Sequence, residues 1–208
     1  IIGASGLVGH KLVDQLLNRA DIEKIRVFVR RKASIIHPKI EEHLIDFRKP
    51  ENWKHLVQGD IIFLTLGTTI KKAKTKENQY LVDFTFQYEF AKTAAENGVQ
   101  TCVLMSSMGA NPKSSVFYSR MKGELEEAIE QLNFSKLLIF RPSILDGDRQ
   151  EKRAGEKVGL ILSRFLTQFI LKAYRPTPVD VLVAKMIRLS LDKVSGIRTI
   201  RGLELFQN

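Results

Sequence analysis

A tyrosine and a lysine four residues apart are the pair in this sequence best suited to acid–base chemistry. Tyr118 and Lys122 lie in a segment with helical periodicity, and this spacing puts both side chains on one face of a helix. A phenol has a pKa of about 10, so it transfers protons poorly at neutral pH. A nearby ammonium stabilises the phenolate and lowers that pKa. We therefore expect Tyr118 to pass a proton to or from a carbonyl oxygen and Lys122 to tune it.

Two serines could polarise the same carbonyl. Ser106 and Ser107 end an apolar run that precedes Tyr118 by 11 to 12 residues. The sequence does not say which hydroxyl would serve. An ordinary surface pair is the alternative interpretation of Tyr118 and Lys122. A serine hydrolase is excluded, because the chain has no Gly-x-Ser-x-Gly motif and no suitably placed histidine and acid.

Three glycines, Gly3, Gly6 and Gly9, stand between an apolar strand and a helix. The first permits a tight turn, the second lets the backbone approach a pyrophosphate, and the third lets the helix pack closely on the sheet. The N-terminus of the helix then points backbone N–H groups at the phosphates. The segment predicts a dinucleotide site; a tight turn without a ligand is the alternative.

Cations follow the second predicted strand where many such sites carry an acid. The sequence after Val29 is Arg30, Arg31 and Lys32. An acid at this place binds the ribose 2′-hydroxyl of NAD, whereas arginine pairs with a phosphate through two hydrogen bonds. We therefore predict NADPH or NADP rather than NAD. Solvated surface cations are the alternative.

Two further strand ends could contact the adenosine half of the cofactor. Asp46 could accept a hydrogen bond from the adenine amine, or it could cap the turn that follows it. Leu66, Gly67 and Thr68 come after a buried strand, and Gly67 permits close backbone approach.

The elements that must position these residues alternate between strand and helix up to about residue 141. The strands are apolar runs without clean alternation, which is typical of a parallel sheet buried on both faces. We predict one α/β domain over 1–208, a Rossmann-type doubly wound parallel sheet with a small substrate-side lobe at 146–208. The predicted strands end at 2 and cover 25–29, 43–45, 60–66, 101–106, 136–140 and about 198–200, and the predicted helices cover 7–19, 78–97 and 119–132.

Composition limits the other possibilities. The net charge of +10 invites a nucleic-acid partner, but the cations are scattered and no nucleic-acid-binding motif is present. The densest run, Lys71 to Lys76, predicts a solvated loop, a docking surface for an acidic partner or a rim that attracts a phosphorylated cofactor. No apolar stretch is long enough for a membrane span, the four histidines lack metal-ligand spacing, and the single cysteine, Cys102, predicts a buried thiol in the cytoplasm.

These motifs are similar to those of the atypical and extended short-chain dehydrogenase/reductase superfamily, and more narrowly of its Tat-interacting-protein-like NADPH-binding oxidoreductases. The supporting stretches are 3–9, 66–69, 106–110, 117–126, 140–142 and 148–153. The resemblance implies Tyr118 as the acid–base residue. It also implies cofactor contacts from Ser5, Gly6, Leu7, Val8, Arg30, Arg31, Leu66, Gly67, Thr68, Lys122, Leu145 and Arg153.

Two functions follow from these observations. The first is an NADPH-dependent oxidoreductase that acts on a small carbonyl or alcohol. The second is a regulatory protein that senses NADPH and binds a protein partner without significant turnover; the lysine run and the apolar segment 160–171 would be its docking elements. The sequence does not give the substrate or the oligomeric state.

Overall fold

The computed structural model describes residues 1–32, 36–146 and 176–207, and it contains a parallel sheet whose strand order reverses near the start of the chain. The strands are β1 (Ile25–Val29), β2 (Ile40–Leu44), β3 (Ile61–Leu64), β4 (Thr101–Met105), β5 (Lys136–Arg141), β6 (Leu145–Asp146), β7 (Thr177–Pro178) and β8 (Gly196–Arg201). β1 pairs with β2, and β3, β4, β5 and β8 pair in that order, all in parallel. Ile2 bridges Phe28 and Leu64 and so joins the two sets. The first residues therefore form the switch point, beyond which doubly wound sheets bind ligands.

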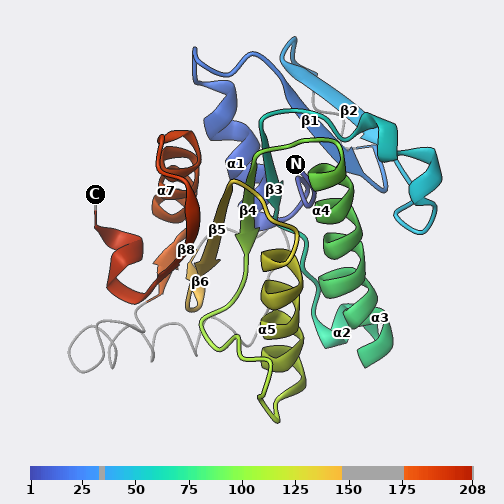
Figure 1. Cartoon of the computed structure of the whole chain (residues 1–208), viewed down its shortest axis with the longest axis vertical. Helices are drawn as coiled ribbons and strands as arrows, with labels where there is room; N and C mark the ends of the chain where they lie inside the picture. Colours follow the sequence, from blue (N-terminus) through green and yellow to red (C-terminus); the bar gives the residue numbers. More distant parts are fainter. Residues whose placement is uncertain (33–35, 147–175, 208) are drawn as a thin grey trace.

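Helices cover both faces of this sheet. They are α1 (Leu7–Leu17), α2 (Ile70–Ala73), α3 (Lys76–Tyr80), α4 (Phe86–Glu96), α5 (Phe117–Glu130) and α7 (Val179–Leu191), with 3-10 turns at Pro50–Asn52, Lys54–Leu56 and Gly202–Phe206. Figure 1 shows α4 and α5 on one side of the strands and α1 and α7 on the other. The predicted doubly wound α/β fold is confirmed.

Alternate residues of the central strands serve the two faces. In β4, Val103 and Met105 pack in the apolar cluster under α1 and α7, whereas Cys102 and Leu104 pack in the cluster under α4 and α5. The first cluster includes helical residues such as Leu12 of α1, and the second includes aromatic residues such as Phe90 of α4. Two buried faces explain why the strands read as continuous apolar runs. Burial also raises the pKa of the Cys102 thiol, which is inert packing material here.

The long helix predicted at 78–97 is interrupted by one wide turn. α3 ends at Tyr80, a π-helical turn spans Leu81–Thr85, and α4 continues to Glu96. Gly98 then closes the helix with φ +83°, as its position after the apolar periodicity predicted. The sequence predicted a regular helix here and did not reveal the π-turn. A search for apolar residues at helical spacing does not detect one inserted residue.

The strand predicted at 43–45 also differs from its predicted position. β2 covers Ile40–Leu44 rather than 43–45. Its first residues are Ile40, Glu41 and Glu42, which are half-buried because the strand lies at the edge of the sheet. Charged residues are common on such edges, and they hid the strand from a search for apolar runs.

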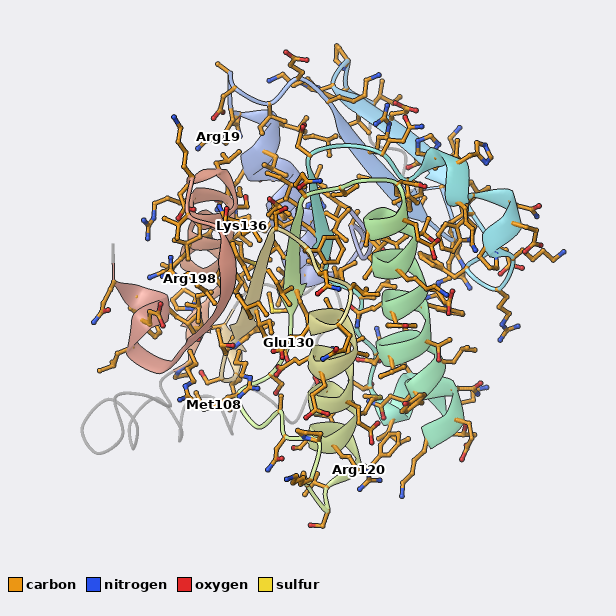
Figure 2. All side chains as sticks on the ribbon, viewed as in Figure 1. Arg19, Met108, Arg120, Glu130, Lys136 and Arg198 are labelled. Carbon is orange, nitrogen blue, oxygen red and sulfur yellow. The ribbon has the colours of Figure 1, made fainter. Side chains whose placement is uncertain are left out.

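β8 and α7 belong to the main sheet and its helical cover, whereas β7 pairs with β6 in a separate two-stranded sheet. Sequence analysis placed 146–208 in a substrate-side lobe, but β8 extends the sheet beside β5 and α7 packs against α1. Lys136, labelled in Figure 2, lies at the start of β5. It donates hydrogen bonds to the Leu189 carbonyl (2.9 Å) and to the Asp192 carboxylate (2.6 Å) at the end of α7. Residues 147–175 of the predicted lobe lie outside the described residues. Within the described part of the chain, no helix has the length and apolar character to cross a membrane.

Candidate functional site

The glycine turn has the geometry that its sequence predicts. Gly3 adopts φ +84°, a conformation that favours glycine. A Cβ at Gly9 would lie 2.1 Å from the Gly3 carbonyl oxygen, so only glycine lets α1 start this close to the strand. A Cβ at Gly3 would in turn meet the backbone of Thr65 at 2.5 Å. The first and third glycines are therefore required by packing.

The start of α1 is open toward a ligand. Ser5 and Gly6 are exposed, and Gly6, the N-cap, supplies no side chain to the first turn. The backbone N–H groups of the first helical turn have no partner within the helix. Leu7 and Val8, which sequence analysis assigned to the cofactor, belong to this turn. An open N-terminus at a sheet switch point fits a pyrophosphate.

Cations extend from the end of β1 into solvent. Arg30, Arg31 and Lys32 are exposed and directly follow the buried Val29. Asp46 follows β2 and is also exposed. Its Oδ1 accepts a hydrogen bond from the Arg48 N–H at 3.0 Å. The turn-capping contact, one of the two alternatives for Asp46, is thus present in the structure.

The loop after β3 is fastened by a buried acid. Gly67 is exposed, and the Thr68 N–H donates to Asp83 Oδ2 at 2.9 Å. Gln79 Nε2 approaches the Thr68 carbonyl oxygen at 3.4 Å. Both partners come from the interrupted helix, so the π-turn positions the loop that the cofactor would follow.

Polar residues on one face of α5 repeat every four positions. Tyr118, Lys122 and Glu126 share this face, and the last two are buried. Lys122 Nζ lies 3.8 Å from Asp83 Oδ1 and 3.5 Å from the Met105 carbonyl oxygen. Burial lowers the pKa of Lys122 and raises that of Asp83, while the opposite charge of each partner opposes both shifts.

Ser107 is the serine that meets Tyr118. Its side chain hydrogen-bonds the Tyr118 side chain, which lowers the phenol pKa. Burial and the negative charge of Asp83 outweigh this effect and raise the pKa of Tyr118 to about 12. We expected Lys122 to lower the Tyr118 pKa. In the structure the lysine is instead paired with Asp83, and Tyr118 is a neutral phenol.

Ser106 belongs to a different network. Its hydroxyl donates to Glu126 Oε1, and the Arg141 guanidinium binds the same carboxylate, with Nε at 3.0 and 3.1 Å from the two oxygens. The serine and the glutamate are buried. This network ties the end of β4 to α5 and to the end of β5.

Sequence analysis missed the two buried acids of the site. Asp83 lies in a helix that was judged by its apolar periodicity alone. A charged residue in the middle of such a helix, between apolar neighbours, was an available signal. Glu126 continues the four-residue spacing from Tyr118 and Lys122, and extending that pattern by one turn would have found it.

Two other residues were assigned to the cofactor from the sequence, Leu145 and Arg153. Leu145 is in β6 and half-buried. Arg153 and the apolar segment 160–171 lie outside the described residues.

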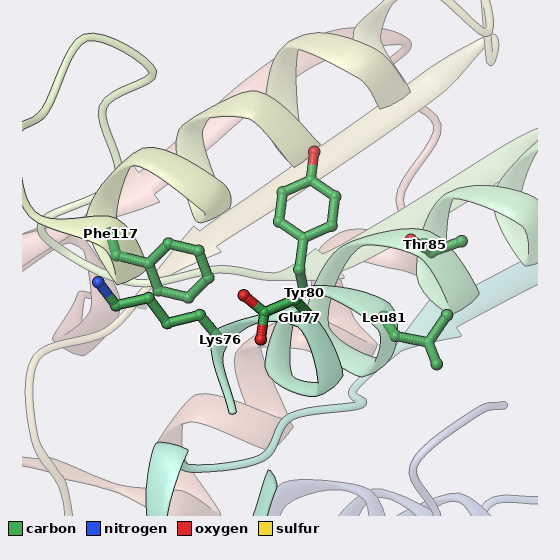
Figure 3. A pocket seen from close by; sticks show the side chains of 6 residues that line it. All are labelled: Lys76, Glu77, Tyr80, Leu81, Thr85 and Phe117. Atoms are coloured by element: carbon green, nitrogen blue, oxygen red, sulfur yellow. The ribbon is translucent and has the colours of Figure 1, made fainter. Parts of the chain in front are cut away.

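A shallow, open pocket of about 430 Å³ lies between α3 and the start of α5. It is lined by Lys76, Glu77, Tyr80, Leu81, Thr85 and Phe117. Figure 3 shows the Lys76 side chain along the Phe117 ring and the Tyr80 ring pointing toward α5. Its described lining contains none of Ser107, Tyr118 and Lys122, so we do not assign the substrate to it.

Comparison with known proteins identifies the family. Residues 3–157 match a family model described as NAD(P)H-binding. The chain belongs to this NAD(P)H-binding family. The matched region includes the glycine turn, the loop after β3 and the face of α5 that carries Tyr118, Lys122 and Glu126. The relationship to atypical short-chain dehydrogenases that the motifs predicted is confirmed.

Several curated relatives are similar over most of the chain. A protein of Candida albicans named FMP52, mitochondrial, is 35% identical and covers 73% of this chain and 68% of its own length. An FMP52 protein of Eremothecium gossypii is 30% identical over 99% of this chain and 94% of its own length. Rat HTATIP2 is 36% identical over 75% of this chain and 66% of its own length.

The names of the fungal relatives contradict the predicted cytoplasmic location. The Candida and Eremothecium proteins are both named as mitochondrial, and they point to mitochondria rather than to the cytoplasm. Our prediction rested on one cysteine. A reduced thiol separates oxidising from reducing compartments, but it does not separate one reducing compartment from another.

Solved structures confirm the fold. UDP-glucose 4-epimerase from Thermotoga maritima has a TM-score of 0.72 at 16% identity, covering 96% of this chain and 75% of the epimerase. A short-chain dehydrogenase/reductase superfamily protein from Agrobacterium tumefaciens with bound NAD has a TM-score of 0.70 at 17% identity, covering 97% of this chain and 76% of its own.

Proposed function

We propose that this protein is an NADPH-dependent oxidoreductase that reduces a small carbonyl compound or oxidises the corresponding alcohol. The observation that carries the proposal is the placement of Ser107 beside Tyr118, with Lys122 on the same face of α5. The serine hydrogen-bonds the tyrosine, and the lysine ammonium lies one helical turn away on the same face. The chain belongs to an NAD(P)H-binding family. NAD(P)H would supply a hydride, and these three side chains would handle the proton.

Each side chain has one role in the reduction. Ser107 orients the carbonyl oxygen, and Tyr118 donates its phenolic proton to that oxygen. The bound nicotinamide supplies the hydride that adds to the carbonyl carbon. The products are the alcohol and a phenolate on Tyr118, which the Lys122 ammonium stabilises until the phenol is reprotonated. Alcohol oxidation runs through the same steps in reverse.

The exposed cations after β1 support NADPH as the cofactor. Arg30 and Arg31 follow the strand whose end holds the adenosine ribose in doubly wound sheets. Neither guanidinium forms a salt bridge among the described residues, so both are available to a 2′-phosphate. Asp46, a possible acid at the neighbouring strand end, already accepts the Arg48 N–H.

The test is turnover of a panel of small aldehydes, ketones and alcohols by purified protein, with Tyr118→Phe as the variant. We expect the variant to lose about a hundredfold to ten-thousandfold in kcat, the usual contribution of a positioned acid. Tyr88→Phe is the matched control, because Tyr88 stacks on Phe84 away from Ser107. If NADPH binds but no panel member turns over, the oxidoreductase assignment fails and a cofactor-sensing role takes its place.

A further inference from the structure

We propose that Asp83 is a positioning residue that ties the loop after β3 to the Lys122 ammonium, so that the cofactor-binding loop and the proton-transfer side chains are held as one unit. This inference rests on the proposed function. It assigns a role to a residue that the motifs did not reveal.

The carboxylate lies directly under the exposed loop. Asp83 is only 1% exposed, and its Oδ2 accepts the Thr68 N–H at 2.9 Å. A Cβ built on Gly67 would lie 3.6 Å from Asp83 Oδ1. The carboxylate is thus bonded to Thr68 and lies beside Gly67. Because Gly67 is exposed and Asp83 is not, the acid supports the loop from its buried side.

The other carboxylate oxygen faces the lysine. Asp83 Oδ1 is 3.8 Å from Lys122 Nζ and has no hydrogen-bond partner among the described residues. This separation is an ion pair but too long for a hydrogen bond. A buried ammonium without a counter-ion is strongly disfavoured. Asp83 and Glu126 are the acids whose charges act on it, and Arg141 already binds Glu126. Asp83 is therefore the counter-ion left for Lys122.

The helix backbone fixes the carboxylate in place. Asp83 occupies the π-turn Leu81–Thr85, and the buried Gln87 Nε2 donates to the Asp83 carbonyl oxygen at 2.7 Å. One-turn π-bulges occur frequently at functional sites. The inserted residue turns the acid toward Thr68 and Lys122, and the glutamine stabilises the widened turn.

The same charge acts on the proton donor. Burial is the larger cause of the raised pKa of Tyr118, and the negative charge of Asp83 is the second cause. The groups that face this phenol are Ser107, Asp83 and, one turn along α5, Lys122. Removing the negative charge while keeping the side-chain shape should lower the Tyr118 pKa. A purely structural buried residue would not produce that change.

Asp83→Asn and Asp83→Ala separate the two contacts. The asparagine oxygen can still accept the Thr68 N–H, so we expect its dissociation constant for NADPH, measured by calorimetry, to stay within about threefold of wild type. Alanine removes the acceptor, and binding should weaken at least about tenfold, the effect of losing one hydrogen bond to a charged group. Glu96→Gln on α4, the helix that follows the π-turn, is the control, since Glu96 pairs with Lys92 at the surface.

Ultraviolet titration of tyrosinate, with Tyr118→Phe as the blank, tests the charge effect without turnover. The Tyr118 pKa should be lower in Asp83→Asn than in wild type and in Glu96→Gln. An unchanged Tyr118 pKa in Asp83→Asn, or equal loss of NADPH affinity in the asparagine and alanine variants, would overturn the inference. If the alanine variant does not fold, the asparagine titration still decides it. Failure of the wild type to turn over any substrate would instead count against the proposed function.

Discussion

Lys122 Nζ lies 3.8 Å from Asp83 Oδ1, and both side chains are almost fully excluded from solvent. The pair spans two elements, the π-turn before α4 and the second turn of α5, and helix α4, strand β4 and their loops lie between them in the chain. It joins the loop after β3 to the Tyr118 face of α5. The lysine is therefore held by an acid, and the tyrosine is a neutral phenol.

The two serines should separate in their effects. Ser107→Ala removes the group that meets Tyr118, so we expect a loss of turnover of about tenfold or more with little change in stability. Ser106→Ala breaks a buried hydrogen bond to Glu126 and should lower the free energy of unfolding by about 1–3 kcal/mol. Urea unfolding and kcat measured on both variants check the assignment. Equal loss of turnover with unchanged stability in both would refute it.

Alkaline pH should destabilise the fold through Tyr118. Its pKa is raised from the ordinary 10.0 of a phenol to about 12 in the folded protein. A group with a raised folded pKa stabilises the fold fully below its unfolded pKa, and that contribution is lost as the pH rises through the folded pKa. Between pH 10 and about 12 the unfolding free energy of wild type should fall more steeply than that of Tyr118→Phe. If the two curves are parallel, the pKa of Tyr118 is not raised in the folded protein.

Two glycines should respond differently to alanine. Gly9→Ala places a Cβ 2.1 Å from the Gly3 carbonyl oxygen, and the clash should cost about 1–3 kcal/mol or more of stability. Gly67→Ala meets only Asp83 Oδ1 at 3.6 Å, an ordinary contact, so the protein should stay stable while NADPH binding weakens. Thermal unfolding and calorimetry distinguish the two. Unchanged NADPH affinity in Gly67→Ala would place the cofactor away from this loop.

The positions of the central strands and the glycine turn could be predicted because they rest on local signals. Apolar runs marked β1, β4 and β5, and the glycine spacing marked the start of α1. The π-turn could not be predicted, since one added residue leaves the apolar periodicity nearly unchanged. The same turn hid Asp83, whose partners Thr68 and Lys122 lie far from it in sequence.

The choice between the two serines also needed three-dimensional structure. Ser106 and Ser107 are adjacent, and in a strand successive side chains point to opposite faces. Only the positions of Glu126 and Tyr118 decide which hydroxyl meets which partner. The C-terminal elements were misjudged for a related reason, because the pairing of β8 with β5 is a contact between distant segments.

The cofactor preference depends on the cations after β1. Replacing Arg30 and Arg31 together by alanine should weaken NADPH at least about tenfold, and should change NADH by about twofold or less, since NADH lacks the 2′-phosphate. Arg188→Ala, an exposed arginine on α7, is the control. Equal losses for both cofactors would show that these guanidinium groups do not read the phosphate.

Calorimetric titration of ligand-free wild-type protein with NADPH and with NADH tests the central claim most directly. The account predicts saturable binding of one dinucleotide per chain, with NADPH bound more tightly than NADH. Absence of heat and of saturable binding for both dinucleotides would contradict it.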